Sequence, residues 1–244
     1  MKSVILCAGY GVRMYPLTTD MAKPLLPIRG KPIIEYIINK IQKVEGMDEI
    51  FIVSNDKFFN QFNKWMNNYP NTIPIKLIND GTNTEKEQLG AVKDLELVID
   101  KKNIEDDLLV VGGDNLFSFA LSDFIKYSMN ITPKPLIGVY DFCDKAKQNK
   151  FGKVNLNDNN QITDFNEKIS NSKNANLVAM CLYFLPKKTL PLIKKYLSIY
   201  NDNGSIGNYI KWLSKNNEVH AFEFQGDWFN INDMDAYTEA VCSF

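Results

Sequence analysis

The first thirty residues combine glycines and cations in an order that suits phosphate binding. An apolar run ends at Ala8, and Gly9, Gly11, Arg13 and Lys23 follow it in that order. Glycines let the backbone approach a phosphate closely and present N–H groups to it. The cations neutralise phosphate charge, and the prolines around Lys23 restrict the direction in which its side chain points. The stretch predicts a site for a polyphosphate such as a nucleoside triphosphate.

Two better-known glycine loops fit this stretch poorly. A dinucleotide-binding loop reads G-x-G-x-x-G, whereas the sixth position here is Met14, and no acidic residue closes the unit about 20 residues later. A Walker loop ends in G-K-[ST], whereas this loop continues with Val12 and Arg13. A plain glycine turn beside a solvated arginine is the structural alternative that stays open.

A second candidate for chemistry is the carboxylate of Asp114, in the stretch LLVVGGDNLF. Gly112 and Gly113 before it allow a ligand to approach closely. A lone carboxylate at the end of a buried strand suits Mg²⁺, because this ion prefers hard oxygen ligands. The alternative role of Asp114 is to cap the next turn.

The elements that must position these residues alternate between strand and helix patterns through the first 145 residues. Short apolar, β-branched runs predict buried strands at Val4–Cys7, Ile50–Val53, Ile75–Ile78, Leu108–Val111 and Leu136–Tyr140. Amphipathic stretches predict helices from Pro32 to Gly46, after Asp56, and from about Gln88 to Ile99. The rhythm is typical of an α/β, doubly wound sheet, whose ligands bind beyond the carboxyl ends of the strands.

The pattern changes after residue 145. The stretch KVNLNDNNQITDF predicts a hairpin, and LVAMCLYFLP predicts a buried strand. Helices at Thr189–Tyr200 and Gly207–Ser214 and a strand at Val219–Phe224 are expected to follow. Because no linker or repeat is visible, we predict a single domain over 1–244. Its nucleotide-binding core would occupy 1–145, and an added hairpin and helical portion in 146–244 would bind the acceptor.

Charge and cysteine content exclude several function classes. The 244 residues carry 28 basic and 29 acidic side chains with no long block of one sign, so we expect no nucleic-acid partner. The four cysteines (Cys7, Cys143, Cys181 and Cys242) lie too far apart for a zinc ribbon and do not indicate a disulfide framework. No signal peptide or membrane-spanning stretch is visible, so we expect a cytoplasmic protein without a membrane partner. Homo-oligomerisation stays open.

The stretch CAGYGVRMYPLT…KPLLPI resembles the signature of the sugar-1-phosphate nucleotidylyltransferases, the group that contains glucose-1-phosphate thymidylyltransferase. The resemblance implies a Rossmann-like, mixed sheet and the Mg²⁺-dependent reaction of an NTP with a sugar 1-phosphate, giving an NDP-sugar and pyrophosphate. It also implies that Arg13 and Lys23 contact the triphosphate and the reacting α-phosphate as catalytic residues. Further nucleotide contacts are implied at Cys7, Ala8, Gly9, Gly11 and Gly113, and metal binding at Asp114.

Two later segments correspond to family elements more loosely. The stretch NDGTNTEKEQLGA resembles the loop that reads the nucleobase, with Asn79 and Gly90 as candidates, although a plain surface loop is the alternative. The stretch FNEKI resembles the family's E-K-P element, in which the glutamate binds sugar hydroxyls and the lysine binds the sugar phosphate. The resemblance gives these roles to Glu167 and Lys168, and an exposed charge pair is the alternative.

Two departures from the family pattern keep other functions open. The family's W-x-D-x-G reads WFNIN here, so the resemblance gives the second metal position to the amide of Asn230, with a carboxylate from Asp227 or Asp233 as the alternative. That change favours a degenerate relative that binds nucleotide or sugar phosphate without turnover. The stretch from Ala179 to Leu182 is expected to remove small or polar sugar-facing positions, which favours a cytidylyltransferase acting on a phosphorylated alcohol or amino alcohol. The intact Arg13, Lys23 and Asp114 favour an active enzyme.

Overall fold

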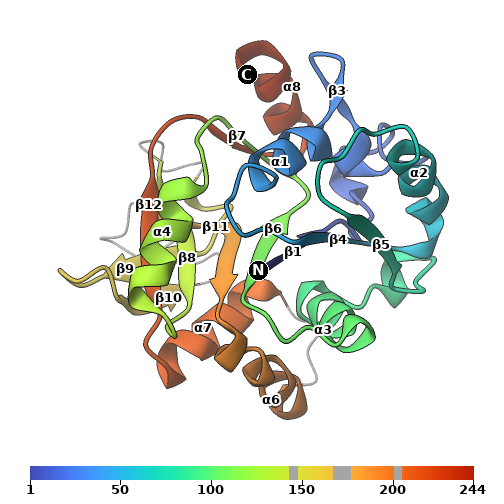
Figure 1. Ribbon diagram of the computed structural model, residues 1–244. Coiled ribbons are helices and arrows are strands. Elements are labelled where there is room, and N and C mark those ends of the chain that lie inside the picture. The colour runs from blue at the N-terminus through green and yellow to red at the C-terminus, as the bar shows by residue number, and fades with distance from the viewer. Residues whose placement is uncertain (143–147, 167–176, 201–204) are drawn as a thin grey trace.

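The computed structural model describes residues 1–142, 148–166, 177–200 and 205–244. Its main feature is a nine-stranded mixed sheet of path β10-β9-β11-β6-β1-β4-β5, in which β8 pairs with β11 and β12 (Figure 1). The strands of this sheet are β1 (Lys2–Leu6), β4 (Glu49–Ser54), β5 (Ile75–Asn79), β6 (Leu108–Gly112), β8 (Leu136–Asp141), β9 (Lys153–Leu156), β10 (Ile162–Asn166), β11 (Leu177–Leu185) and β12 (His220–Phe224). The predicted α/β, doubly wound class is confirmed.

The strands β1, β4, β5 and β6 form the parallel half of the sheet. β1 lies between β4 and β6 and pairs with both in parallel, and β4 pairs in parallel with β5. Parallel neighbours end at the same edge of a sheet, where ligands bind in open α/β folds. The segments that follow β1 and β6 therefore meet at one edge.

Helices cover both faces of the sheet. On one side α1 (Ile33–Ile41), α2 (Asp56–Met66) and α4 (Ser122–Ile131) contribute to one hydrophobic cluster. On the other side α3 (Ala91–Lys102), α6 (Pro191–Ile199) and α7 (Ile206–Asn216) contribute to a second cluster, and these three lie together in Figure 1. Val4 and Ile5 are neighbours in β1 but belong to different clusters, because successive strand residues point to opposite faces.

Later parts of the chain extend the same sheet with antiparallel strands. β11 pairs antiparallel with β6, β8 and β9, and β9 and β10 form the predicted hairpin. Two short ladders lie outside the main sheet: β2 (Pro27–Ile28) with β3 (Lys31–Pro32), and β7 (Asn115–Phe117) with β13 (Trp228–Asn230). The second ladder brings Asn115 opposite Asn230, and α8 (Met234–Ser243) follows it.

The predicted elements agree with the observed ones in type. The first helix is shorter than predicted, because it ends at Ile41 and residues 42–46 form turns and a bend. α4, α8 and the β7–β13 ladder have no counterpart among the predicted elements. Across the described ranges, no helix is both long enough and apolar enough to span a membrane.

Candidate active site

Lys23 and Asp114 form an ion pair at the edge where β1 and β6 end. Lys23 begins a short 3₁₀ helix whose second residue is Pro24, and Asp114 lies in the turn between β6 and β7. Lys23 Nζ lies 2.6 Å from Asp114 Oδ2, and the two side chains are 13% and 20% exposed. Solvent and salt therefore screen this pair less than an ordinary surface pair.

The turn that carries Asp114 packs closely against the end of β1. The Gly113 N–H donates to the carbonyl of Leu6, with an N to O distance of 2.9 Å. A Cβ atom at position 113 would lie 2.5 Å from Cys7 Sγ and 3.0 Å from Leu6 O. Glycine is required there because any larger residue would displace the turn. Gly113 thus sets the position of Asp114, a structural role beyond its predicted nucleotide contact.

The loop after β1 is held by hydrogen bonds on both sides of Gly9, and Gly9 itself is exposed. Asn55 caps α2 and donates from Nδ2 to the Ala8 carbonyl at 2.9 Å. Gly11 has φ +66°, and its carbonyl accepts a hydrogen bond from Thr18 Oγ1 at 2.7 Å. No described atom lies within 4 Å of a Cβ built at Gly9. The backbone of Gly9 is therefore accessible to a ligand, whereas its neighbours are held in place.

Asn232 contacts both predicted catalytic cations, Arg13 and Lys23. Its Oδ1 accepts from Arg13 Nη2 at 3.1 Å and lies 3.4 Å from Lys23 Nζ. Asn232 was not among the predicted site residues, although it occupies the glycine position of the family's W-x-D-x-G pattern. An amide oxygen in place of glycine gives both cations a neutral acceptor and so fixes their direction.

Asn230 lies beside Asp114 with its amide nitrogen facing the carboxylate, and its role as a metal ligand stays a prediction. Asn230 Nδ2 is 3.4 Å from Asp114 Oδ1, and the Ile231 N–H donates to the Asp114 carbonyl at 2.9 Å. Trp228 Nε1 donates to Asn115 Oδ1 at 2.8 Å and ties β13 to the residue after Asp114. Residues more than one hundred positions apart are brought together by this short ladder.

The donor set at Asp114 suits a hard cation that arrives with further ligands. Asp114 supplies one carboxylate, and Asn230 Oδ1 is buried without a hydrogen-bond partner among the described residues. In that same part of the chain, no group of three His, Cys, Asp or Glu side chains could hold a metal alone. Mg²⁺ takes one or two carboxylates and completes its octahedral shell with phosphates and water. The residues therefore fit Mg²⁺ that is bound together with a nucleotide.

The loop after β5 carries the residues predicted to read the nucleobase. Asn79 is the last residue of β5, and its Oδ1 accepts from the Gly81 N–H at 2.8 Å. Gly90 has φ +91° and directly precedes α3. The Tyr10 hydroxyl donates to Thr82 Oγ1 at 3.0 Å and ties this loop to the loop after β1. The two loops are thus adjacent, and the contacts of Asn79 and Gly90 with a base stay predictions.

The two thiols near Asp114 are uncharged. Burial raises the pKa of Cys7 well above its usual value, and the negative charge of Asp114 acts in the same direction. Burial also raises the pKa of Cys181 to about 12. Because the thiolate is the nucleophilic form, neither cysteine supplies a nucleophile at neutral pH. Both pack around the site as small apolar groups.

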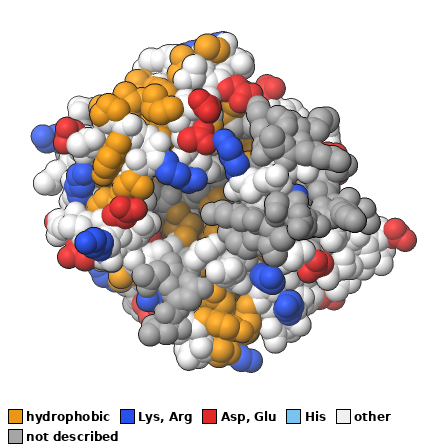
Figure 2. Space-filling model, turned by 180° about the vertical axis from the view of Figure 1, so that it is seen from behind, with side chains coloured by type: hydrophobic (Ala, Val, Ile, Leu, Met, Phe, Trp, Pro, Cys, Tyr) orange, Lys and Arg blue, Asp and Glu red, His pale blue; other side chains and the backbone are white. Residues whose placement is uncertain are grey.

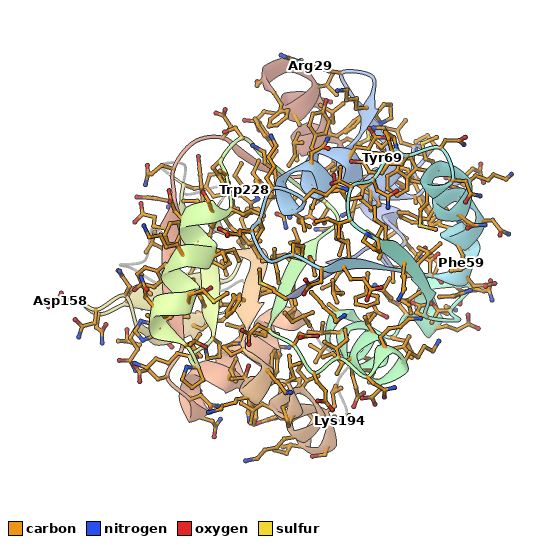
Figure 3. All side chains as sticks on the ribbon, in the orientation of Figure 1. Arg29, Phe59, Tyr69, Asp158, Lys194 and Trp228 are labelled. Carbon is orange, nitrogen blue, oxygen red and sulfur yellow. The ribbon has the colours of Figure 1, made fainter. Side chains whose placement is uncertain are left out.

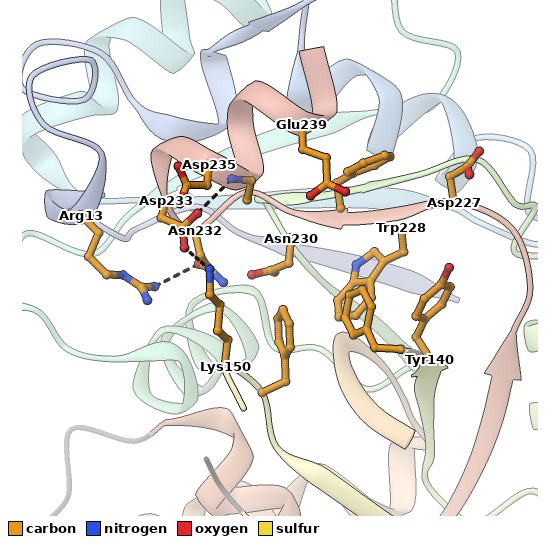
Figure 4. Close-up of a pocket in the computed structure, with 14 residues that line it drawn as sticks. Arg13, Tyr140, Lys150, Asp227, Trp228, Asn230, Asn232, Asp233, Asp235 and Glu239 are labelled. Carbon is orange, nitrogen blue, oxygen red and sulfur yellow. Dashed lines mark hydrogen bonds and ion pairs between the residues drawn. The ribbon is translucent and has the colours of Figure 1, made fainter. Parts of the chain in front are cut away.

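Two cavities open beside the Lys23–Asp114 pair and share Arg13, Asn230 and Asn232 in their walls. The larger has a volume of about 440 Å³ and is drawn in Figure 4, and the smaller, about 230 Å³, reaches Asp114. On the face seen in Figure 2, basic and acidic side chains gather around a hollow with hydrophobic surface at its floor. The cavities offer space for ligands beside Arg13 and Asn232.

β11 turns alternate side chains toward the smaller cavity. Ala179, Cys181 and Tyr183 line it, whereas Met180 and Leu182 are fully buried on the opposite face of the strand. Only every second residue of 179–182 faces this cavity, so Met180 and Leu182 do not line it, and which of these positions faces a sugar stays a prediction. The predicted acceptor contacts Glu167 and Lys168 lie outside the described residues.

The chain is similar in sequence to known nucleotidyl transferases. The family model described as nucleotidyl transferase matches residues 2–244. The bifunctional protein GlmU of Methanocaldococcus jannaschii is 31% identical over 231 residues, which cover 95% of this chain and 51% of that protein. The glucose-1-phosphate adenylyltransferase of Clostridium novyi is 24% identical over 257 residues, covering 98% of this chain and 65% of that protein. The chain thus spans about half the length of its GlmU relatives.

Solved structures share the fold at low sequence identity. A UDP-glucose pyrophosphorylase complexed with UDP-glucose has a TM-score of 0.81 at 19% identity, covering 99% of this chain and 97% of that one. A UTP-bound UGPase from Acinetobacter baumannii has a TM-score of 0.78 at 20% identity, covering 99% of this chain and 92% of that one. Since the family model covers all but the first residue, the chain belongs to the nucleotidyl transferase family.

Proposed function

We propose that the protein transfers a nucleoside monophosphate from an NTP to a sugar 1-phosphate, giving an NDP-sugar and pyrophosphate. The observation that carries the proposal is the convergence of Arg13 and Lys23 with Asp114 at the edge where β1 and β6 end. Family membership supports the same reaction class. Relatives named for glucose-1-phosphate adenylyl transfer and for UDP-glucose pyrophosphorolysis support the choice of a sugar phosphate as acceptor.

In the proposed reaction, an oxygen of the acceptor phosphate attacks the α-phosphorus of the NTP. A new P–O bond forms, the bond from the α-phosphorus to the α–β bridging oxygen breaks, and pyrophosphate leaves. The attacking oxygen belongs to an already ionised phosphate, so the reaction needs no general base. The protein contributes alignment of two polyanions and neutralisation of their charge. Gly9 presents its backbone N–H, and Arg13 and Lys23 hold positive charge against the reacting phosphates.

Asn232 gives the cations their direction before substrate binds. Because Arg13 and Lys23 both approach its neutral Oδ1, they are oriented without having their charge cancelled at that contact. Lys23 is also paired with Asp114, and a triphosphate would compete with the carboxylate for the ammonium group. We infer that substrate binding shifts Lys23 from Asp114 toward phosphate, which frees the carboxylate for a cation.

We also propose that the enzyme uses Mg²⁺, held by Asp114 and by the orphaned Oδ1 of Asn230. When bound, the ion would supply positive charge to the triphosphate and to the departing pyrophosphate. The contacts of Glu167 and Lys168 with the acceptor, and those of Asn79 and Gly90 with the base, remain part of the proposal. Cytoplasmic location and homo-oligomerisation stay predictions.

The function is tested by measuring pyrophosphate release with each common NTP against a panel of sugar 1-phosphates, with the product identified by mass spectrometry. We expect release that requires both substrates and yields the corresponding NDP-sugar. Lys126→Ala, on the exposed side of α4, serves as a folded control that should match the wild type. Absence of pyrophosphate with every pair would favour a relative that binds without turnover.

A further inference from the structure

Tyr10 connects the two loops in which nucleotide contacts are predicted. Residues 7–11 form the β1 loop, which follows β1, and residues 80–90 form the β5 loop, which joins β5 to α3. Tyr10 is 4% exposed, and its hydroxyl donates to Thr82 Oγ1 at 3.0 Å. Burial raises the pKa of Tyr10, so the hydroxyl keeps its proton and acts as the donor. The side chain that anchors the β1 loop therefore directly follows Gly9, the exposed residue predicted to meet phosphate.

The acceptor of this hydrogen bond is itself held in place. Thr82 is 5% exposed, and its hydroxyl donates to the carboxylate of Asp80, whose two oxygens lie 2.9 and 3.1 Å from Thr82 Oγ1. The Thr82 N–H donates to Asp80 Oδ1 at 2.7 Å, and the Thr82 carbonyl accepts from the Asp56 N–H at 2.9 Å. Because a hydroxyl has one proton and two lone pairs, the proton of Thr82 faces Asp80 and a lone pair faces Tyr10.

The residues that follow Thr82 in the β5 loop are tied to one another. Glu87 Oε2 accepts from the N–H groups of Asn83 and Thr84 at 3.0 and 3.1 Å. The Thr84 side chain in turn accepts from the backbone of Glu87, which completes a reciprocal capping pair. A shift of Thr82 would therefore move this part of the loop with it, and Gly90, predicted to contact the base, ends the same loop.

We propose that Tyr10 is a positioning residue that couples recognition of the nucleobase to placement of the α-phosphate. The proposal rests on the proposed function and deepens it, because it concerns how the enzyme selects its NTP. An NTP whose base fits the β5 loop uses the Tyr10–Thr82 hydrogen bond to align its phosphates with Gly9 and the cations. An NTP whose base does not fit gains little from the same bond, so the bond contributes to selection among NTPs.

Tyr10→Phe removes the hydroxyl and leaves the other supports of both loops in place. The ring keeps its position near Phe58, at a centroid distance of 6.4 Å. The first residues of α2 still hold one backbone group in each loop, since Asn55 Nδ2 donates to the Ala8 carbonyl at 2.9 Å and the Asp56 N–H donates to the Thr82 carbonyl. We therefore expect the variant to fold, which urea denaturation checks.

The test measures kcat/KM of wild type and Tyr10→Phe for the preferred NTP and for the next-best NTP with the same acceptor. We expect the value for the preferred NTP to fall about five- to tenfold, the size of one hydrogen bond, and the value for the next-best NTP to change less than about twofold. The ratio of the two values therefore falls. A role confined to stability would lower both values equally and leave their ratio unchanged.

Variants of Thr82 test the same hydrogen bond from its other end. Thr82→Val removes the hydroxyl and should lower the NTP ratio as Tyr10→Phe does, whereas Thr82→Ser keeps the hydroxyl and should retain the wild-type ratio. Combining Tyr10→Phe with Thr82→Val should lower the ratio no further, because both changes remove one bond. Tyr69→Phe is the matched control, since Tyr69 lies in the turn after α2 (Figure 3) and its hydroxyl donates to Asn39 Oδ1 at 3.1 Å.

The outcomes separate this inference from the proposed function. Pyrophosphate release with an unchanged NTP ratio in folded Tyr10→Phe would overturn the inference and leave the function standing. If NTPs bind but no pyrophosphate is released, the proposed function fails, and the ratio of dissociation constants for the two tightest-binding NTPs, from calorimetric titration, still decides. A ratio lowered by Tyr10→Phe and Thr82→Val, but not by Thr82→Ser or Tyr69→Phe, supports the coupling. A wild-type protein that binds every NTP equally, or none, overturns it.

Discussion

Lys23 Nζ lies 2.6 Å from Asp114 Oδ2, although the two residues are 91 positions apart in the chain. The contact links the loop after β1 to the turn after β6, which are neighbours because those strands are adjacent and parallel. It therefore places a cation and a carboxylate at the edge where open α/β sheets bind ligands. In the proposed function, Lys23 would bind phosphate and Asp114 would bind a metal ion.

Replacing Lys23 should remove catalysis without unfolding the protein. Because its ammonium group would stabilise charge that moves in the transition state, we expect Lys23→Ala to lower kcat about 100- to 1000-fold. The free energy of unfolding should fall by about 1–3 kcal/mol, because the mostly buried carboxylate of Asp114 loses its cationic partner. Steady-state kinetics and urea denaturation check both values, with Lys126→Ala as the control. Unchanged kcat in folded Lys23→Ala would remove Lys23 from the catalytic residues.

The two glycines of the site should respond differently to alanine. Gly113→Ala places a Cβ 2.5 Å from Cys7 Sγ, so we expect it to lower the free energy of unfolding by about 1–3 kcal/mol and to displace Asp114. Gly9→Ala meets no described atom within 4 Å, so its stability should match the wild type. If Gly9 contacts phosphate, its added methyl group should still raise KM for the NTP. Normal KM in a stable Gly9→Ala protein would contradict a phosphate contact there.

Asp94 should make stability fall as pH rises. Its side chain is 3% exposed with an unpartnered Oδ1 among the described atoms, and burial, aided by Asp80, raises its pKa from 3.8 to about 8. Between these values the folded protein keeps a proton that the unfolded chain releases. The stabilisation is complete below the unfolded pKa and is lost as pH rises toward the folded pKa, by at most about 1.4 kcal/mol per pH unit.

Asp94→Asn removes this titration while preserving the size of the side chain. Urea denaturation from about pH 5 to about pH 8 should give a free energy of unfolding that falls more steeply with pH in the wild type than in the variant. Some carboxylates, such as Asp233 and Glu218, have a lowered pKa and contribute to the pH dependence of stability with the opposite sign. Their contribution is the same in both proteins and cancels when the two free energies of unfolding are subtracted. Parallel curves would show that Asp94 ionises as readily in the folded protein as in the unfolded chain.

The assignment of Asn230 as second metal ligand predicts a change in Mg²⁺ dependence. Asn230→Asp would add a carboxylate beside Asp114, so the Mg²⁺ concentration for half-maximal rate should fall about tenfold. Asn232→Asp is the matched variant, because it adds the same charge two residues away but disturbs the contacts with Arg13 and Lys23. No shift for Asn230→Asp together with a clear shift for Asn232→Asp would transfer the ligand role to Asn232.

Much of the fold could be predicted from the sequence because its strands are buried on both faces. Runs such as Val4–Cys7 and Leu108–Val111 are continuous and β-branched, and the structure places strands there. The helix beginning near Pro32 was predictable from its five buried isoleucines. Once those strands are parallel, the meeting of the loops that follow them at one edge is a consequence of topology.

Other parts of the fold and of the site have no local sequence pattern that predicts them. The β7–β13 ladder joins three-residue strands from distant parts of the chain, so neither strand has a length or alternation that predicts it. Among the described residues of α8, only Ala240 is buried, which leaves no apolar stripe at helical spacing. Asn232 depends on that ladder for its position beside the cations, so its role could be recognised only in three dimensions.

The central claim is tested most directly by following the two ends of a labelled NTP. An NTP carrying one label at the α-phosphorus and another at the γ-phosphorus is incubated with the protein and a phosphorylated acceptor, and the products are separated. We expect the α label to appear in the NDP-acceptor product and the γ label in pyrophosphate, in equal amounts. Release of the γ label as orthophosphate, or no transfer of the α label to any acceptor, would contradict it.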